Sequence, residues 1–411
     1  MACPKCRDLP ARNRTFRRVA LIIASTLPPR ASAKPHEPAD LTLLDYDRLV
    51  RGHDYSREVA RAYSHDGLGI LAVVGAPSGL FEKPRTTLLH LARQLALSNP
   101  HKLEAYERPE LSYANVRAYL KQPYAGLPPH SQRSNPIEGW SRGKEIFHGK
   151  PDTTKGSWYS HALEDAPAHG DATAHRYPLI SAPNIWPTSI VGHEFESSFK
   201  LLARALFDLS AYVLANADKA LQLQDPHKQT TSLLSITHNR SRLHVGRLLH
   251  YYAPSSENST EEGDGELEIE KQRTMWCGWH NDNSVITVIP PALWLDEITG
   301  DAVPADVCPT GGLIVRTRKG RTVEVRVPAG SPGAICRAVP KLVCESFVLF
   351  VEPHWDEMIG EADKLQDLHD CDAANEDVIP SLSRRLPKLP VEFGQFLADS
   401  FTEYYSSNLK S

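Results

Sequence analysis

Residues 278–289 constrain the fold of this chain more than any other stretch. The run Ser284-Val285-Ile286-Thr287-Val288-Ile289 is rich in β-branched residues, and such a run predicts a β-strand. His280 and Asp282 lie two residues apart just before it, so in an extended backbone their side chains point to the same side. An imidazole and a carboxylate therefore converge on one point at the entrance to a strand.

This pair would supply two of the three ligands of a metal site built from two histidines and one carboxylate. Such sites hold non-haem Fe(II) in oxygenases and leave positions on the metal open for substrate and oxygen. A His-x-Asp tripeptide in isolation is more often a strand entrance where the two side chains bond each other or a nearby turn. The rest of the chain has to decide between these interpretations.

The composition is that of an ordinary soluble protein. The chain has 411 residues, enough for one large domain or two ordinary ones. Charged residues make up 23% and the net charge is -4, so we expect a small-molecule ligand, no nucleic acid and no membrane partner, and a monomer. No apolar run is long enough to span a bilayer. The 32 prolines favour loops and short strands over long helices.

The cysteines indicate a cytoplasmic location, and the N-terminal segment allows one alternative. Seven scattered cysteines are typical of reduced thiols in an intracellular compartment. Residues 1–36 are rich in arginine, contain the apolar run 19–24, and resemble an organelle transit peptide, with Ala31-Ser32-Ala33 as a possible signal-peptidase site. A disordered tail is an equal alternative. In either case, we expect residues 1–36 to be separate from the fold.

From residue 41 to 234 the pattern predicts a helical and α/β portion. Helical patterns cover 46–64, 84–97 and 195–223, and residues 70–74 predict a strand. In the last helix, apolar residues recur at spacings of three and four, which predicts a face packed on the core. They are Phe195, Phe199, Leu202, Leu206, Leu209 and Val213. The loops of 120–190 are rich in Pro, Gly, His and Ser, and we expect them to cover a site.

After Leu234 the chain changes to strands. Residues 242–252 predict one strand, residues 313–317 and 322–327 predict a hairpin, and 346–351 predict a buried central strand. We therefore expect an α+β fold with a double-layered β-barrel core over 235–358, flanked by helices. Residues 359–411 are expected to form a C-terminal loop and helix.

Six short strings follow one another along the chain. They are Gly67-Leu68-Gly69-Ile70-Leu71, Gly139-Trp140-Ser141-Arg142-Gly143-Lys144-Glu145, Lys155-Gly156-Ser157-Trp158-Tyr159, Pro183-Asn184-Ile185-Trp186-Pro187, Leu248-Leu249-His250-Tyr251-Tyr252 and Gly278-Trp279-His280-Asn281-Asp282. In this order they resemble the isopenicillin N synthase-like branch of Fe(II)/2-oxoglutarate-dependent dioxygenases. The resemblance runs from about residue 41 to 408, including Val391-Glu392-Phe393-Gly394-Gln395-Phe396.

The resemblance implies a double-stranded β-helix, or jelly roll, with an N-terminal α/β portion packed around it. It also implies an oxidoreductase that uses Fe(II), 2-oxoglutarate and O2 to hydroxylate or desaturate a small molecule. His280 and Asp282 match the family's first two iron ligands. Tyr252 and Ser346 match positions that contact 2-oxoglutarate.

The chain departs from this family at two further positions. The family's third iron ligand is a histidine, yet residues 283–353 contain none. Cys344 falls where the family has an arginine that grips 2-oxoglutarate, and a neutral thiol cannot replace a guanidinium there. Residues 329–334, rich in Gly and Pro, stand where the family fits a strand, a turn and the start of another strand.

Three explanations compete. The first, which we favour, is a form of the chain that lacks about one strand pair near 328–337, because removing a central strand exposes an unpaired edge. The second is a catalytically inactive jelly-roll binding protein that has lost iron and cosubstrate. In the third, His354 would replace the missing ligand, but it lies ten residues beyond Cys344, on the order of 30 Å along a strand. We expect Glu352, His354 and Asp356 to be surface turn residues instead.

Overall fold

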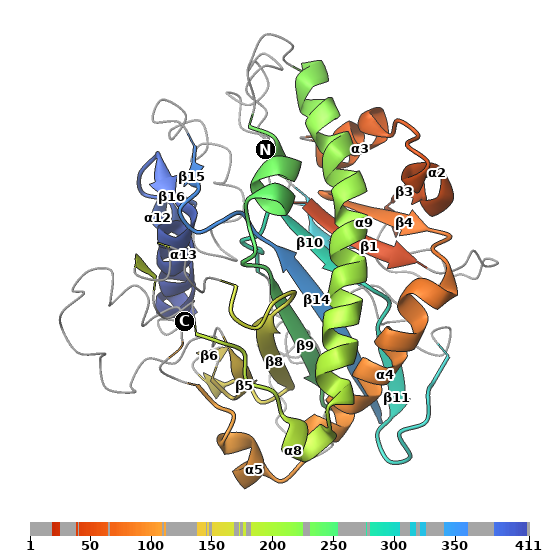
Figure 1. The fold of residues 1–411 in the computed structure, drawn as a ribbon, viewed down its shortest axis with the longest axis vertical. Helices are drawn as coiled ribbons and strands as arrows, with labels where there is room; N and C mark the ends of the chain where they lie inside the picture. Colours follow the sequence, from red (N-terminus) through yellow and green to blue (C-terminus); the bar gives the residue numbers. More distant parts are fainter. Residues whose placement is uncertain are drawn as a thin grey trace, which may run out of the picture.

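The computed structural model describes residues 19–24, 38–39, 41–64, 66–108, 111, 138–144, 146–147, 150–167, 172, 176–177, 182–224, 231–253, 277, 280–304, 313–317, 321–325, 341–360 and 382–408. These residues form a large mixed sheet with two long helices across one face (Figure 1). No helix in this part of the chain is long and apolar enough to cross a membrane.

The large sheet has nine strands within the described residues. In spatial order they are β3 (Thr42–Asp45), β4 (Ile70–Val74), β1 (Val19–Ala24), β10 (Ile286–Ile289), β14 (Leu342–Val351), β9 (Val245–Tyr251), β8 (Lys155–His161) and β5 (Gly139–Arg142), with β11 (Leu293–Asp296) also paired to β14. Neighbours from β3 to β10 are parallel, and neighbours from β10 to β5 are antiparallel.

Strand β1 lies inside the sheet, which differs from the expectation that residues 1–36 stand apart from the fold. Its residues pair in parallel with β4 on one side and β10 on the other. A strand buried between two neighbours reads as a continuous apolar run, and the core of a targeting segment reads the same way. Local sequence therefore could not separate the two for residues 19–24.

Two helices, α4 (Ser78–Ala96) and α9 (Glu194–Gln224), cover one face of the large sheet (Figure 1). The predicted apolar face of α9 is confirmed, since all six residues of its stripe are at most 2% exposed. Gly246 lets α9 approach closely, because a Cβ there would lie 2.5 Å from Phe199 Cζ. Phe199 also meets Phe347 of β14 edge-on, with ring centroids 5.0 Å apart.

A smaller sheet packs on the opposite face of β4. It consists of β12 (Leu313–Arg316), β13 (Thr322–Val325) and β2 (Pro38–Ala39), and its first two strands confirm the predicted hairpin. Ile70 and Ala72 of β4 contact Val325, whereas Leu71 and Val73 between them face the helices. The described residues thus form two sheet layers with helices outside, consistent with the α+β class.

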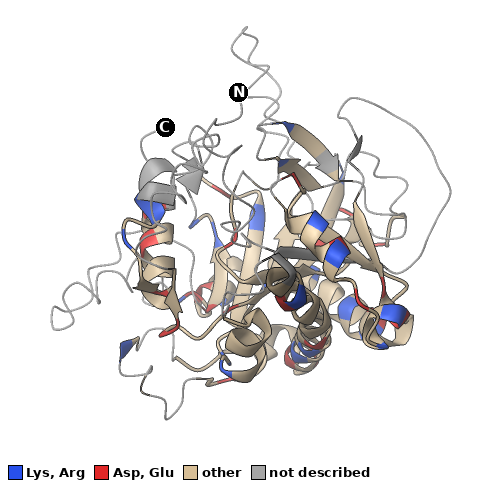
Figure 2. Ribbon diagram, turned by 90° about the horizontal axis from the view of Figure 1, so that it is seen from above, with Lys and Arg blue, Asp and Glu red and all other residues tan. Residues whose placement is uncertain are grey.

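The remaining helices and strands are short, apart from the C-terminal helix α13 (Phe393–Asn408). They are α2 (Tyr46–Val50), α3 (Ser56–Tyr63), α5 (Pro100–Glu104), α8 (Thr188–Val191), a π-helix (Ser235–Asn239), α12 (Leu382–Arg385), β6 (Ile146–Phe147), β7 (Lys150–Pro151), β15 (Met358–Ile359) and β16 (Val391–Glu392). The helical pattern of 46–64 is split into α2 and α3 around Gly52, whose φ is +84°. Acidic and basic residues alternate over the helices without separating into single-sign faces (Figure 2).

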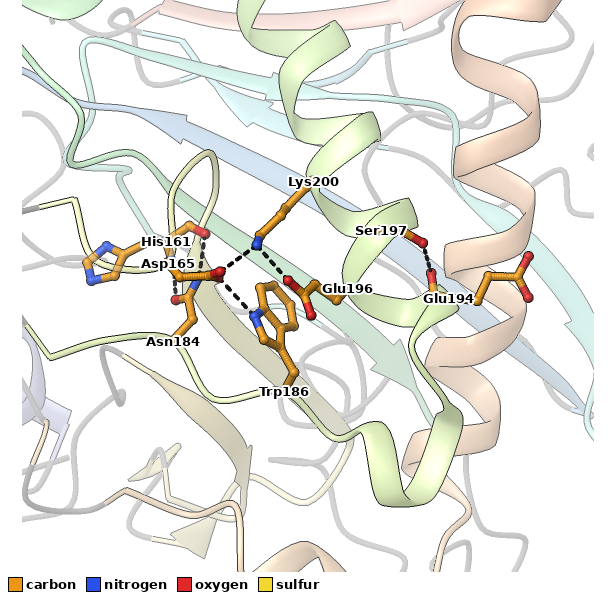
Figure 3. A network of polar contacts seen from close by, with 8 residues as sticks. All are labelled: His161, Asp165, Asn184, Trp186, Glu194, Glu196, Ser197 and Lys200. Carbon is orange, nitrogen blue, oxygen red and sulfur yellow. Dashed lines mark hydrogen bonds and ion pairs between the residues drawn. The ribbon is translucent and has the colours of Figure 1, made fainter.

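A polar network ties the loop after β8 to the start of α9 (Figure 3). Asp165 accepts hydrogen bonds from Asn184 Nδ2 at 3.1 Å, Trp186 Nε1 at 3.0 Å and Lys200 Nζ at 2.7 Å. Asn184 also exchanges hydrogen bonds with the backbone of His161. Burial opposes ionisation of Asp165, but these donors outweigh it and hold the pKa of Asp165 below its ordinary value. This part of the expected cover is therefore a fixed loop, and Asn184 and Trp186 have a structural role in it.

Candidate active site

The site lies over the face of the large sheet that turns away from α4 and α9, here called the distal face. Successive residues of a strand alternate between faces, so the residues between those that contact the helices belong to the distal face. Leu248 and Phe347 pack toward the helices, whereas Leu249, Tyr251 and Cys344 form a separate cluster on the distal face. Cys277, in the segment that leads to β10, packs against this second cluster.

His280 and Asp282 lie side by side, as predicted. His280 Nε2 is 3.5 Å from Asp282 Oδ1, and both residues precede β10. The other ring nitrogen, Nδ1, is 3.6 Å from Cys277 Sγ. The imidazole thus lies between a thiol and a carboxylate, and Cys277 is a site residue that sequence reasoning missed. Its position three residues before His280 was the available signal.

The three groups share charge. The negative charge of Cys277 raises the pKa of His280 well above its ordinary value, and Asp282 adds to the effect. Burial opposes ionisation of Cys277, but His280 outweighs it and lowers the pKa of the thiol. Lys155 and Arg247 act on Cys277 in the same direction. The geometry favours a thiolate paired with an imidazolium beside an ionised carboxylate.

Basic side chains occupy the distal face next to this group. Lys155 of β8 is opposite Tyr251, which is opposite Cys344, so these three residues form one row across the sheet. Lys155 is 6% exposed and makes a salt bridge with Asp152. Arg247 of β9 donates hydrogen bonds from Nε and Nη2 to Ser157 Oγ at 3.2 and 3.0 Å.

The structure does not bring Tyr252 and Ser346 together, although the resemblance implies that both contact 2-oxoglutarate. Tyr252 O–H donates to Ala96 O at the end of α4 at 3.1 Å, and its ring packs against the helix-side core. Burial raises the pKa of Tyr252 to about 12. Ser346 precedes Phe347 and follows Glu345, and Phe347 packs on the helix side, so Ser346 belongs to the distal face. Tyr251 shares that face with it.

The segment after β14 also differs from expectation, because Glu352 and His354 are only 4% and 8% exposed. Burial raises the pKa of Glu352 to about 8. His354 Nδ1 lies 2.6 Å from Asp356 Oδ1, and Asp356 is exposed, as expected of a turn residue. Glu352 and His354 therefore belong to the interior at the end of β14.

Two buried histidines lie on β9 or directly before it. His250 Nδ1 is 2.6 Å from Glu345 Oε1, and this pair faces the helix side, away from His280. His244 Nδ1 accepts a hydrogen bond from the backbone N–H of Glu352 at 3.2 Å. Burial lowers the pKa of His244 to about 3. Both are therefore core histidines with defined partners.

The residues present fit part of an iron site. Two donors that share one ion at about 2.1 Å lie about 3 Å apart, close to the separation of His280 Nε2 and Asp282 Oδ1. A third donor is missing from the described part of the chain, where no group of three or more His, Cys, Asp or Glu residues could hold a metal ion. The region near 328–337, where the third histidine was expected, lies outside the described residues.

Neither a protein-family model nor a curated protein matches this chain. The chain is similar to 2-oxoglutarate/Fe(II) oxygenases of known structure. One is a full-length thymine-binding protein from Neurospora crassa, solved in complex with alpha-KG and thymine. It has 15% identity and a TM-score of 0.48, with coverage of 88% of this chain and 96% of that one.

A second is a putative 2OG-Fe(II) oxygenase family protein from Caulobacter crescentus, with 18% identity, a TM-score of 0.46 and coverage of 87% and 96%. A third is JOX2 in complex with 2OG, Fe and JA, with 14% identity, a TM-score of 0.45 and coverage of 92% and 91%. At these identities and TM-scores, the ligands named are properties of those proteins.

Proposed function

We propose that this protein is a non-haem Fe(II)/2-oxoglutarate-dependent oxidoreductase with a jelly-roll core, acting on a small molecule, in a form that keeps two of its iron ligands. The observation that carries the proposal is the 3.5 Å approach of His280 Nε2 to Asp282 Oδ1 at the entrance of β10. A small rotation of either side chain would bring both donors onto one ion. The resemblance of the surrounding strings supports the same assignment.

Bound iron of this class supplies oxygen activation coupled to the decarboxylation of 2-oxoglutarate. The part played by His280 is to present Nε2 to the metal, and for this it must lose the proton that Cys277 and Asp282 favour. Metal binding should therefore release a proton and become stronger as the pH rises. The apolar cluster around Tyr251 and Cys344 keeps water away from this side of the site.

Lys155 and Arg247 are the cations that could face a cosubstrate carboxylate in this chain. Both lie on the distal face with Cys344, the position where the resemblance places an arginine. Each is already held by a neighbour, Lys155 by Asp152 and Arg247 by Ser157. They should attract an anion without the bidentate grip of the missing guanidinium, so we expect weak cosubstrate binding.

The test is metal binding by the full chain and by variants. Co(II) is titrated anaerobically and followed by its visible absorption, and His280→Ala or Asp282→Ala should abolish the signal. His354→Ala is the matched control, because His354 and Asp356 form a second His-x-Asp pair, 2.6 Å apart. Thermal unfolding confirms that each variant is folded. Metal binding that survives His280→Ala, or that His354→Ala removes instead, refutes the assignment.

A second candidate function is a catalytically inactive binding protein on the same scaffold. It is favoured by the lack of a three-donor group among the described residues. Under this alternative, a ligand such as 2-oxoglutarate would bind equally well with and without Fe(II). Oxygen-dependent formation of succinate by the purified chain would exclude it.

A further inference from the structure

Strand β1 is paired along both of its edges. Four of its residues are in register with β10, from Val19 opposite Ile286 to Ile22 opposite Ile289. Five are in register with β4, from Ala20 opposite Ile70 to Ala24 opposite Val74. Both neighbours run parallel to β1 (Figure 1).

Without β1, the large sheet would be interrupted. In the described residues, β3 and β4 join the other strands of this sheet only through β1. The two edges left open would belong to strands whose residues are apolar and buried, among them Leu71 and Val288, both 0% exposed. Open edges of that kind present unpaired N–H and C=O groups and pair readily with other chains.

The composition of residues 19–24 suits this position. The segment Val19-Ala20-Leu21-Ile22-Ile23-Ala24 has no charge, no proline and no glycine, as a strand buried between parallel neighbours requires. Meanwhile, the stretch near 328–337 is short by about one strand pair relative to the family that the chain resembles. A chain short of strands gains from any apolar segment that can close its sheet.

We propose that the gap between β4 and β10 is a binding site for an extended apolar segment in parallel orientation, and that residues 19–24 of the same chain occupy it. The N-terminal segment is then a structural part of the protein and is retained in its functional form. Removal of residues 1–36 would open the site to a second apolar strand, including one from another copy. This inference is independent of the iron site.

The first experiment compares two deletions. A chain lacking residues 1–17 keeps the strand, and its midpoint of thermal unfolding should stay within about 2 °C of the full chain. A chain lacking residues 1–36 should unfold at least about 5 °C lower or associate, because two edges are open. Equal stability of both deletions would overturn the proposal.

The second experiment uses the full chain, so it does not depend on whether the deletion folds. Hydrogen exchange of the amides of residues 20–23 should be at least about hundredfold slower than in an unstructured chain, as in the neighbouring β10. Leu21→Pro should remove this protection and speed exchange in 286–289, whereas Ala11→Pro, outside the strand, should not. Unprotected amides at 20–23 would overturn the proposal. Protection found only in a stable dimer would assign the site to a second copy and overturn the intrachain assignment.

Discussion

The buried pair of His250 and Glu345 should be far more important for stability than an exposed pair of the same kind. His250 Nδ1 and Glu345 Oε1 are 2.6 Å apart, and their side chains are 1% and 0% exposed. Burial raises the pKa of Glu345, against the opposing effect of His250. Removal of one partner leaves the other buried without its main polar contact, and such losses cost about 3 to 5 kcal/mol. His101 and Glu104 provide the comparison, 3.5 Å apart with side chains 86% and 64% exposed.

The assay is urea unfolding at pH 7, with the slope checked for each variant. Glu345→Ala should lower the free energy of unfolding by about 3 to 5 kcal/mol, and Glu104→Ala should change it by less than about 0.5 kcal/mol. The double variant His250→Ala/Glu345→Ala should cost clearly less than the sum of the two single variants, since neither group is then left unpaired. If Glu345→Ala and Glu104→Ala cost the same, or if the two buried substitutions add, the reasoning fails.

Three further predictions concern pH and packing. The folded pKa of His244 is about 3, below its unfolded value, so its stabilising contribution is lost as the pH falls from about 6.5 toward 3; His244→Asn should flatten this part of a plot of unfolding free energy against pH. The folded pKa of Glu352 is about 8, above its unfolded value, so stability is lost as the pH rises from about 4.5 through 8; Glu352→Gln should flatten that part, and an unchanged curve would contradict its burial. Gly246→Ala should cost about 1 to 3 kcal/mol in the same urea assay, because the new Cβ would lie 2.5 Å from Phe199 Cζ, and a neutral result would contradict the close approach of α9.

The elements predicted well from sequence are those whose pattern is local. The β-branched, apolar character of residues 70–74 and 286–289 identifies β4 and β10, and the three-and-four spacing of residues 195–213 identifies the buried face of α9. The nearness of His280 and Asp282 was equally local, because it needs only two residues in an extended segment.

The features missed depend on pairing between distant segments. The strand of residues 19–24 is defined by β4 and β10, which nothing in its own sequence specifies. Tyr252 and Tyr251 exchange roles because a register difference of one residue moves a side chain to the other face of a sheet. Glu352 was expected at the surface because of its charge, whereas packing at the end of β14 buries it.

The central claim is that His280 and Asp282 belong to an iron and 2-oxoglutarate site that is incomplete in this chain. Its most direct test is an anaerobic calorimetric titration of the full 411-residue chain with 2-oxoglutarate in the presence of Fe(II). The missing guanidinium removes charge-assisted hydrogen bonds of roughly 1.5 to 3 kcal/mol each, and the missing histidine weakens the metal itself. We therefore predict no saturation at micromolar 2-oxoglutarate. A micromolar dissociation constant would contradict the account and show that another residue of this chain completes the site.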